Sequence, residues 1–481
     1  MVHLPRVMLA APASGSGKTT VTCGLLQVLK NRGLDPASFK CGPDYIDPMF
    51  HSRVIGAKSR NLDTFFAEKE VIRYLFAKTA LGSGISVLEG VMGIYDGLGG
   101  TSLRASSYDL AQVTDTPIIL VVNARGMSRS VIPMICGYLD YQKQFGKRMI
   151  RGVILNQTTR MTYLMLKDQI EQETGIRLYG YVPRLTDCVI ESRHLGLVTP
   201  DEILDLRQKL ERLSEELEEC LDMEGILNLA ETAEDYRDEE LTMPESAAVF
   251  CRDTRDTNEK VGRTAESGTA LRPRIAVAMD EAFCFYYQDN LDLMEEMGAE
   301  LVPFSPVHDA ALPEAISGIL LGGGYPELYA EALAANQTMR DQIRRRIENG
   351  IPYLAECGGF MYLHESMEDM EGRSWPMCGC IGGKSFRTPK LSRFGYISLS
   401  SEPGEEQLLP QGQTIRGHEF HYFDSTSAGC SYLAAKPAGR RQWQCIHGTK
   451  NSAAGYPHLY YWSDPEFIYR FIRQCAGYSG T

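Results

Sequence analysis

A lysine set among small residues near the start of the chain could bind the phosphates of a nucleotide. Its run, Ser14-Gly-Ser-Gly-Lys-Thr-Thr20, follows a short apolar stretch and precedes a helical pattern. Glycine lets backbone N–H groups approach phosphate oxygens, Lys18 can reach the β- and γ-phosphates, and the Thr19 hydroxyl can face Mg²⁺. An ordinary turn capped by Thr19 is the alternative. The residues predicted to contact the nucleotide here are Ser14, Gly15, Ser16, Gly17, Lys18, Thr19 and Thr20.

Carboxylates follow two further strand patterns in the first half of the chain. Glu89 ends the apolar run 85–89. Asp44 and Asp47 follow a short strand predicted near 38–40, in a loop that two prolines and a glycine keep irregular. Ligands bind at the carboxyl ends of strands in open α/β sheets, so Glu89 is predicted to hold Mg²⁺ directly or through water. For the loop, a surface turn with aspartate as turn former is the alternative.

Strands and helices alternate along the first half, which implies a mostly parallel, doubly wound α/β sheet. The strands are predicted near residues 7–11, 38–40, 85–89, 117–123 and 150–156, and the helices near 19–30, 68–81, 129–145 and 162–173. At the end of the last strand, Asn156 is a candidate contact for adenine, with the loop 181–184 as its neighbour. A helix N-cap or a turn residue is the alternative for Asn156.

A cysteine followed by two glycines in the second half could be a nucleophile. Cys357 stands between a predicted strand, 351–356, and a predicted helix. In such an elbow the tight turn exposes the thiol, while the helix N-terminus and the next N–H group lower its pKa and form an oxyanion hole. Three glycines at 322–324, after another predicted strand, could also point N–H groups at an anion. A buried structural thiol is the alternative.

A cysteine nucleophile needs a base, and three of the nine histidines lie in two late stretches of the chain, 417–421 and 455–460. They are His418, His421 and His458, in stretches whose alternating apolar residues predict strands. Spacing alone does not choose among them.

The composition excludes several kinds of partner. The chain is 43% hydrophobic and 23% charged, with a net charge of −13, whereas nucleic acids and anionic membranes require a basic face. No apolar run approaches the roughly 20 residues of a membrane span, and the N-terminus has no signal-peptide pattern. We therefore predict a cytoplasmic protein. Its thirteen cysteines include no Cys-x-x-Cys pair, which predicts buried thiols rather than a zinc site.

The length of 481 residues predicts two or more domains. Hydrophobic periodicity fades over 232–272, where charged runs give way to a mixture of glycine, serine and threonine. Such a segment buries too little apolar surface to offset its ordering entropy. We predict a charged, partly disordered linker there, between domains at 1–231 and 273–481.

Four motifs together resemble the cobyrinate a,c-diamide synthase family, whose members are glutamine-dependent amidases of corrinoid biosynthesis. The motifs are Lys40-Cys-Gly-Pro-Asp-Tyr-Ile-Asp-Pro48, Asn61-Leu-Asp63, Glu89-Gly-Val-Met-Gly-Ile-Tyr-Asp-Gly97 and Ala355-Glu-Cys-Gly-Gly359. The resemblance covers nearly the whole chain apart from the charged segment. It implies an N-terminal P-loop synthetase domain related to dethiobiotin synthetase and a C-terminal class I, triad-type glutamine amidotransferase domain, both of α/β fold.

The resemblance also chooses among the candidate residues of the second half. The residues it implies are the nucleophile Cys357, the histidine His458 that raises its nucleophilicity, and the oxyanion-hole residues Gly323 and Gly358. His418 and His421 match another histidine motif of the family, either structural or near the ammonia path. Many class I glutaminases carry a glutamate two residues after the histidine, where this chain has Tyr460. The third member of the triad therefore stays open.

For the first half, the resemblance implies that ATP activates a carboxylate. An acetate side chain of the corrin ring attacks the γ-phosphate, and the acyl phosphate reacts with ammonia released from glutamine, which yields cobyrinate a,c-diamide in cobalamin biosynthesis. ATP and Mg²⁺ are the implied cofactors. The residues implied are Thr19, Asp47 and Glu89 for the metal, and Asp44, Tyr45, Asp47 and Asp96 for substrate activation.

Other functions remain as alternatives. The same amidation could act on hydrogenobyrinate or nickel-sirohydrochlorin. A P-loop ATPase switch of the partitioning type, with a C-terminal binding module, is a hypothesis from another class, and the elbow at 355–359 speaks against it. Glutamine and a corrinoid are the predicted partners, neither nucleic acid nor a membrane is expected, and a homodimer is one oligomeric state that the sequence leaves open.

Overall fold

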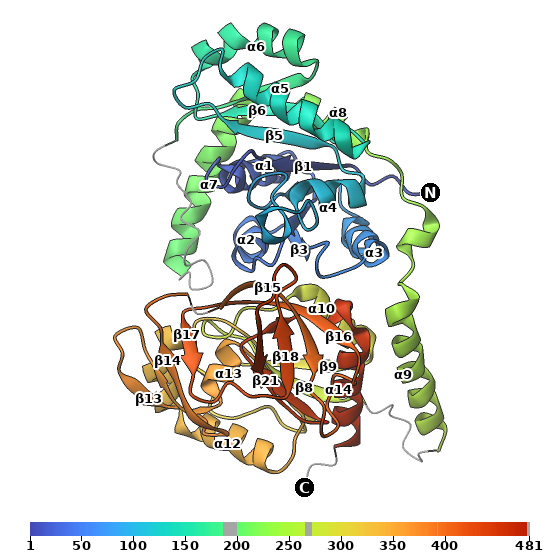
Figure 1. Ribbon diagram of the computed structural model, residues 1–481, viewed down its shortest axis with the longest axis vertical. Helices are drawn as coiled ribbons and strands as arrows, with labels where there is room; N and C mark the ends of the chain where they lie inside the picture. Colours follow the sequence, from blue (N-terminus) through green and yellow to red (C-terminus); the bar gives the residue numbers. More distant parts are fainter. Residues whose placement is uncertain (186–199, 265–271, 392, 479–481) are drawn as a thin grey trace. The chain divides into compact units, whose positions relative to one another are not determined.

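The computed structural model describes residues 1–185, 200–264, 272–391 and 393–478. The chain divides into two compact units, Met1–Met243 and Pro244–Thr481 (Figure 1). Each unit has a central sheet of its own.

The first unit is built on a seven-stranded sheet in the order β3-β2-β4-β1-β5-β6-β7, with every neighbouring pair parallel. Its strands are β1 (Arg6–Ala10), β2 (Pro36–Cys41), β3 (Lys58–Leu62), β4 (Ile85–Glu89), β5 (Ile118–Asn123), β6 (Ile150–Asn156) and β7 (Arg177–Val182). All five residues of β1 are buried, as expected for a parallel strand whose sheet is covered on both faces. The predicted α/β architecture is confirmed.

Helices pack on this sheet and complete its core. They are α1 (Lys18–Asn31), α2 (Ile46–Phe50), α3 (Lys69–Ala80), α4 (Ser107–Thr114), α5 (Val131–Tyr141), α6 (Arg160–Thr174), α7 (Pro200–Cys220) and α8 (Met223–Glu231), with short helical turns η1 (His51–Ile55), η2 (Leu98–Gly100) and η3 (Gln142–Phe145). In one core cluster, Val7 and Leu9 of β1 join Leu25 of α1 and Leu213 of α7. This cluster fixes α1, and hence the loop before it, against the central strand.

The strand order reverses at β1, since β2 to β4 lie on one side of it and β5 to β7 on the other. Ligands bind at such a switch point, outside the carboxyl ends of the strands. The run 14–20 follows β1, and Glu89 ends the neighbouring β4. The fold therefore brings the predicted phosphate loop and the predicted metal ligand to one edge of the sheet.

The segment 232–272 differs from the predicted linker. It contains a short helical turn, η5 (Asp238–Leu241), and a 20-residue helix, α9 (Glu245–Thr264). The boundary between the two units also falls inside it. Residues 265–271 lie outside the described residues. The predicted linker thus contains helical structure over both elements, and its part as a flexible linker between domains stays a prediction.

A few well-placed contacts order this segment. Tyr236 is fully buried, and the guanidinium carbons of Arg6 and Arg73 lie 4.8 and 4.0 Å from the centroid of its ring. In α9, Ala247 and Cys251 are buried at helical spacing. A hydrophobicity average over the segment misses these contacts, because cation–π stacking lets charged side chains pack against an aromatic ring.

The second unit has a six-stranded sheet in the order β20-β21-β11-β10-β8-β9, in which β20 runs antiparallel to β21 and the other neighbours are parallel. Its strands are β8 (Arg274–Ala278), β9 (Glu300–Phe304), β10 (Gly318–Leu321), β11 (Tyr353–Glu356), β20 (His447–Gly448) and β21 (Ser452–Gly455). Its helices after α9 are α10 (Gln288–Glu296), α11 (Ala330–Ala335), α12 (Gln337–Glu348), α13 (Gly358–Tyr362) and α14 (Pro465–Gly477), with η6 (Pro326–Leu328) and η7 (Tyr461–Ser463). The three glycines 322–324, Cys357 and the segment that carries His458 thus follow three adjacent strands.

Two smaller sheets complete the second unit. A four-stranded sheet has the order β13-β12-β14-β17, and a five-stranded sheet has the order β19-β18-β15-β16-β22. Their strands are β12 (His364–Glu368), β13 (Ser374–Pro376), β14 (Ile381–Arg387), β15 (Arg393–Ser401), β16 (Thr414–His421), β17 (Phe423–Ser425), β18 (Tyr432–Ala435), β19 (Gln442–Cys445) and β22 (His458–Leu459). In the register of β16 and β22, His418 lies opposite His458.

Candidate functional site

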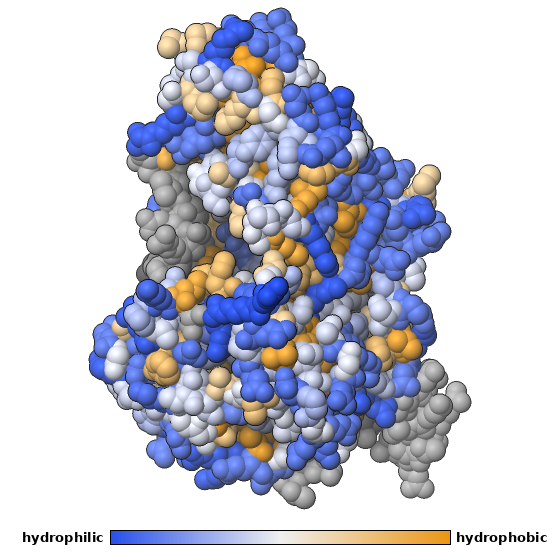
Figure 2. Space-filling view, in the orientation of Figure 1, coloured by the Kyte–Doolittle hydropathy of each residue, from blue (hydrophilic) through white to orange (hydrophobic). Residues whose placement is uncertain are grey.

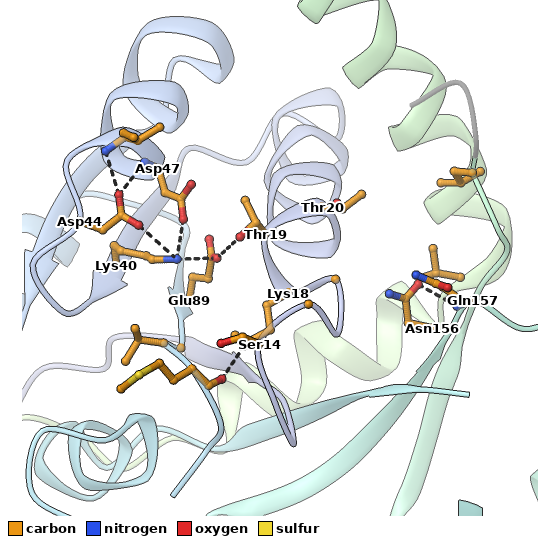
Figure 3. A pocket seen from close by; sticks show the side chains of 18 of the residues that line it. Ser14, Lys18, Thr19, Thr20, Lys40, Asp44, Asp47, Glu89, Asn156 and Gln157 are labelled. Carbon is orange, nitrogen blue, oxygen red and sulfur yellow. Dashed lines mark hydrogen bonds and ion pairs between the residues drawn. The ribbon is translucent and has the colours of Figure 1, made fainter. Parts of the chain in front are cut away.

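A cavity of about 720 Å³ opens at the carboxyl edge of the first unit's sheet (Figure 3). Its volume is within the range of small-molecule sites. The predicted residues that line it are Ser14, Gly15, Gly17, Lys18, Thr19, Thr20, Asp44, Asp47, Glu89 and Asn156. Ser16 shapes the loop instead, because its hydroxyl donates to the carbonyl of Ala13 (2.9 Å). Tyr45 and Asp96 are not among the lining residues.

Gly17 and Asn156 fix the form of the phosphate loop. Gly17 has a φ of +91°, and a Cβ there would lie 2.1 Å from Nδ2 of Asn156, so only glycine fits. That Nδ2 donates to the carbonyl of Ser16 (2.8 Å), while Oδ1 accepts from the N–H of Gln157 (2.9 Å). Asn156, the predicted adenine contact, thus turns its amide to the backbone of the phosphate loop. A different loop, 182–185, lines the cavity next to it.

Lys18 is held in the cavity by backbone oxygens. Its Nζ donates to the carbonyls of Met92 (2.6 Å) and Ala13 (3.3 Å). Met92 adopts a left-handed φ of +45°, which is a strained conformation for a residue other than glycine. Burial lowers the pKa of Lys18, and the neighbouring Lys40 lowers it further. A phosphate oxygen is a stronger acceptor for this ammonium than either carbonyl.

Lys40 lies at the centre of an acidic cluster beside the phosphate loop (Figure 3). Its Nζ is 2.5 Å from Oδ2 of Asp47, 2.7 Å from Oε1 of Glu89 and 4.0 Å from Oδ2 of Asp44. The hydroxyl of Thr19 donates to the same Oε1 of Glu89 (2.6 Å). The sequence motif contained Lys40 without giving it a role. Its position at the end of a strand, next to carboxylates at the ends of neighbouring strands, was the signal that could have found it.

Burial and charge oppose each other in this cluster. Burial by itself would lower the pKa of Lys40, but the Glu89 and Asp47 carboxylates outweigh it and raise that pKa well above its usual value. Burial raises the pKa of Glu89 to about 7, against the pull of Lys40. For Asp47 the attraction of Lys40 exceeds the effect of burial, and the pKa is lowered. Lys40 therefore keeps one carboxylate charged in a nearly dry environment.

The cluster fits a divalent cation that also binds phosphate. The described residues contain no group of three histidine, cysteine or acidic side chains arranged around a metal. Mg²⁺ commonly takes one or two carboxylates together with substrate phosphates and water. Glu89 offers a buried oxygen, Oε2, that has no hydrogen-bond partner among the described residues and lies 3.8 Å from Nε2 of His51. Thr19 and Glu89 could thus contribute ligands, with Asp47 next to them.

The remaining acidic residues are placed by turns. Asp44 accepts the N–H groups of Ile46 (2.8 Å) and Asp47 (3.2 Å), and burial raises its pKa. Asp44 thus forms a turn and also lines the cavity, so both alternatives for this loop hold. The loop is less irregular than predicted, because α2 begins at Ile46. Tyr45 is buried, and Asp96 is exposed, with Oδ2 accepting from the N–H of Gly93 (3.0 Å).

In the second unit, Cys357 forms the elbow between β11 and α13. Its φ is +47°, a strained value for cysteine, and its N–H donates to the carbonyl of Gly455 on β21 (2.8 Å). Burial raises the pKa of the thiol, and the Glu327 carboxylate raises it further, although the N–H of Gly358 acts the other way. The lowered thiol pKa expected from the elbow is therefore wrong for the free protein. The five-residue α13 is too short to offset burial.

The glycine loop after β10 packs closely against the elbow. The N–H of Gly359 donates to the carbonyl of Gly322 (2.9 Å), and a Cβ on Gly358 would lie 3.2 Å from the nitrogen of Gly324. A Cβ on Gly323 would lie 2.3 Å from Cε1 of His458. The fold thus brings the two predicted oxyanion-hole glycines, 323 and 358, and the predicted catalytic histidine into one place.

His458 is buried beside the nucleophile's strand. Its Nδ1 lies 4.0 Å from Oε2 of Glu356, the residue before Cys357. Burial lowers the pKa of His458 to about 3, and His421 adds to the effect. The ring of His418 stacks on that of His458, with centroids 5.0 Å apart and planes 18° apart, and its Nδ1 lies 3.1 Å from the hydroxyl of Tyr287.

The bonds of His421 distinguish it from His458. Its Nδ1 lies 2.5 Å from the carbonyl of Phe423 and its Nε2 3.4 Å from Oε2 of Glu419, and its ring stacks on Tyr456 at 4.0 Å. Both ring nitrogens therefore face acceptors, and neither can readily take a proton from a thiol. This geometry favours His458 over His421 as the base, a choice that spacing could not make.

Both halves of the chain match known families. Residues 7–197 match the CobQ/CobB/MinD/ParA nucleotide binding domain, and residues 274–466 match the CobB/CobQ-like glutamine amidotransferase domain. The first unit is therefore a P-loop nucleotide-binding domain, and the second unit is a glutamine amidotransferase domain, as the sequence predicts.

Several curated relatives extend over nearly the whole chain. A protein of Caldanaerobacter subterraneus subsp. tengcongensis named cobyrinate a,c-diamide synthase is 38% identical, with 98% of both chains covered. Proteins of the same name from Listeria innocua and Thermoplasma volcanium are 39% and 37% identical, with 96% and 99% of this chain and 98% and 99% of theirs covered. Among the described residues no helix is both long and apolar enough to cross a membrane, and the face seen in Figure 2 is mostly hydrophilic.

Proposed function

Since this chain belongs to the cobyrinate a,c-diamide synthase family and is a glutamine-dependent carbon–nitrogen ligase, we propose that it amidates the a and c acetate side chains of cobyrinate. The observation that carries the proposal is the identity of 38% to a protein of that name over 98% of both chains. The reaction would use ATP and glutamine in the cytoplasm, as a step of cobalamin biosynthesis.

In the first unit, a substrate carboxylate oxygen would attack the γ-phosphorus of ATP, which forms an acyl phosphate and releases ADP. Lys18 supports this step because its ammonium can exchange the carbonyls of Met92 and Ala13 for β- and γ-phosphate oxygens. Asn156 would keep the loop in its phosphate-binding form, and Gln157 and Arg184, which also line the cavity, would contact the adenine.

With Lys40 and a bound metal, the acidic cluster would offset the negative charge of the phosphates and carboxylates during this step. Thr19, Asp47 and Glu89 would hold Mg²⁺, which supplies positive charge to the phosphate oxygens when bound. Lys40 lies between Asp47 and Glu89, so it offsets the repulsion between these carboxylates and an incoming acid. Asp44, Tyr45 and Asp96 are proposed to orient the carboxylate that is activated.

In the second unit, the Sγ of Cys357 would attack the side-chain amide carbon of glutamine. The N–H groups of Gly323 and Gly358 would bind the oxyanion, and His458 would accept the thiol proton and pass it to the departing ammonia. Water would then hydrolyse the thioester to glutamate. Ammonia must reach the acyl phosphate unprotonated, which requires a route shielded from bulk water. Its attack on the acyl carbon forms the amide and releases phosphate.

An apolar surface next to the phosphate loop supports a large ring as substrate. Met92 and Tyr141 are exposed, and Tyr95 stacks on Tyr138 with centroids 5.7 Å apart and planes 8° apart. The hydroxyl of Tyr138 donates to the carbonyl of Pro12 at the start of the loop (3.2 Å). Acetate side chains are short, so the ring that carries them must come close to the γ-phosphate. The exposed ring of Tyr141, with the half-buried rings of Tyr95 and Tyr138 next to it, suits a macrocycle.

Phosphate release in the presence of ATP and glutamine tests the proposal. The tetrapyrroles to compare are cobyrinate, hydrogenobyrinate and nickel-sirohydrochlorin, with mass spectrometry of each product. We expect fastest turnover with cobyrinate and two amides in the product. Faster turnover with hydrogenobyrinate or nickel-sirohydrochlorin would mean that this tetrapyrrole, and not cobyrinate, is the substrate. Turnover that is independent of any tetrapyrrole would instead favour a switch ATPase. Sedimentation of the same sample gives the oligomeric state, for which we propose a homodimer.

A further inference from the structure

We propose that Glu356 positions His458 in the glutaminase site, in place of the carboxylate that many class I glutaminases carry two residues after the histidine. The inference rests on the proposed roles of Cys357 and His458. At the usual position this chain has Tyr460, whose side chain cannot serve as a carboxylate. Glu356 comes from a different element, since it is the last residue of β11 and directly precedes the nucleophile.

The carboxylate of Glu356 reaches both ends of the segment that carries the histidine. Oε2 lies 4.0 Å from Nδ1 of His458, and Oε1 accepts a hydrogen bond from the hydroxyl of Tyr461 (3.1 Å). His458 is buried, with 3% of its side chain exposed, and Glu356 is mostly covered, with 13% exposed. Electrostatic attraction between them is therefore weakly screened.

The backbone holds these two residues together independently of their side chains. Glu356 pairs with Gly455 in the register of β11 and β21, and the chain then returns within three residues to His458. Asn290 clamps the following residues, because its Nδ2 donates to the carbonyl of Leu459 (2.8 Å) and its Oδ1 accepts from the N–H of Tyr461 (2.9 Å). Asn290 thus holds the segment in place together with Glu356, whose carboxylate also accepts from Tyr461 and from the N–H of Leu459.

A carboxylate on the Nδ1 side has two effects on a catalytic histidine. It selects the tautomer in which Nδ1 carries the proton, so that Nε2 can accept from the thiol, and it stabilises the imidazolium that follows. Burial raises the pKa of Glu356 to about 8 and lowers that of His458 to about 3. When Glu356 is ionised, transfer of the thiol proton from Sγ of Cys357 to Nε2 places an imidazolium beside a carboxylate, and the site neither gains nor loses a proton.

Two tyrosine hydroxyls and the N–H of Leu459 face the same carboxylate. The hydroxyl of Tyr286 donates to the carbonyl of Ala278 and accepts from the N–H of Gly322 (2.8 Å). Burial raises its pKa, so it stays neutral. Tyr461 is also a neutral hydroxyl whose pKa burial raises. Of the groups described around Glu356, His458 is the one that becomes a cation during the reaction.

The test uses the full chain with Glu356→Gln, Glu356→Asp and the control Glu300→Gln. Glutamate release from glutamine gives kcat and KM, and phosphate release with ammonium chloride gives the activity of the first unit. We expect Glu356→Gln to lower glutaminase kcat roughly 10–100-fold with KM for glutamine within about twofold, and Glu356→Asp to recover part of the loss. Glu300, on β9, is half exposed and paired with Arg274 (3.0 Å), so its variant should match the wild type.

The pH dependence of Cys357 alkylation by iodoacetamide reports the pH at which the thiolate forms. A purely structural role of Glu356 would leave this pH unchanged. Without the carboxylate the imidazolium is less stable, so the thiolate should form at higher pH in Glu356→Gln than in the wild type. An unchanged alkylation profile, a kcat within twofold of the wild type, or an equal loss of ammonia-dependent activity would overturn the inference. A wild type that releases no glutamate, or a Cys357→Ser variant that still does, would instead overturn the proposed function.

Discussion

Two buried glutamates end strands in the two units, and their partners differ. Glu89 ends β4 and meets the ammonium of Lys40 at 2.7 Å, whereas Glu356 ends β11 and meets the imidazole of His458 at 4.0 Å. Burial raises the pKa of Glu89 to about 7 and that of Glu356 to about 8. The first unit thus contains a permanent counter-charge, as binding of phosphates and a metal requires, whereas the imidazolium that faces Glu356 in the second unit forms only during the reaction.

Removal of the phosphate contact in the first unit should have the largest effect. Lys18→Ala should lower amidation by about 10³-fold or more with either glutamine or ammonia, because both nitrogen sources need the acyl phosphate. Product formation measured with each source checks this. Glutamate release in the same sample controls for folding of the second unit. Amidation that continues without Lys18 would remove ATP activation from the scheme and with it the contrast between the two glutamates.

Removing the thiol should affect one nitrogen source alone. Cys357→Ser is expected to lower glutamine-dependent amidation by about 10³-fold and to leave ammonia-dependent amidation within about twofold, because serine in this buried elbow is a far weaker nucleophile. Parallel assays with glutamine and with ammonium chloride measure the two activities. Loss of both in a variant that still binds ATP would show that the units do not divide the chemistry as proposed.

The counter-charge of the first unit, Lys40, can be removed by substitution and compared with a matched control. Lys40→Met leaves Asp47 and Glu89 buried without their cation, so the free energy of unfolding should fall by about 3–5 kcal/mol. Protonation of Glu89 relieves part of this loss, so the destabilisation should be smaller at pH 6 than at pH 8. Thermal unfolding at both pH values measures it. Lys58→Met, on β3, removes a half-exposed lysine 4.0 Å from Asp35 and should have little effect.

A stability unchanged by Lys40→Met at pH 8 would contradict the comparison. It would mean that Glu89 gives up its charge without cost and behaves as Glu356 does. The first unit would then hold no permanent charge pair, and the proposed part of Lys40 in offsetting repulsion during carboxylate activation would have to be withdrawn.

The backbone arrangement follows from local patterns, whereas these two partnerships do not. Short apolar runs that end in glycine, aspartate or glutamate predict the strands, and strand–helix alternation predicts the parallel sheets and the loops at their carboxyl edges. Lys40 and Glu89 are 49 residues apart, and Glu356 and His458 lie more than a hundred residues apart in the chain. The register of β11 beside β21 brings the second pair together, and no local pattern encodes it.

The smallest expected effect concerns the pH dependence of stability. The pKa of Glu356 is raised from 4.5 to about 8, so the folded chain binds this proton more tightly than the unfolded chain. Its contribution to stability is therefore fully present below pH 4.5 and is lost as the pH rises through 8. Glu356→Gln cannot titrate. Between pH 5 and pH 8 the wild type should thus lose about 2 kcal/mol relative to this variant, less than the full shift because water can reach a partly exposed carboxyl.

Thermal unfolding of both chains at pH 5, 6.5 and 8 measures this difference, with Glu300→Gln expected to follow the wild type. A difference that stays constant across the range would show that Glu356 has the same pKa in the folded and unfolded chains. Such a carboxylate would be charged in the resting site and would hold His458 as a permanent ion pair. The second unit would then resemble the first, and the distinction between a standing charge and one formed during the reaction would no longer hold.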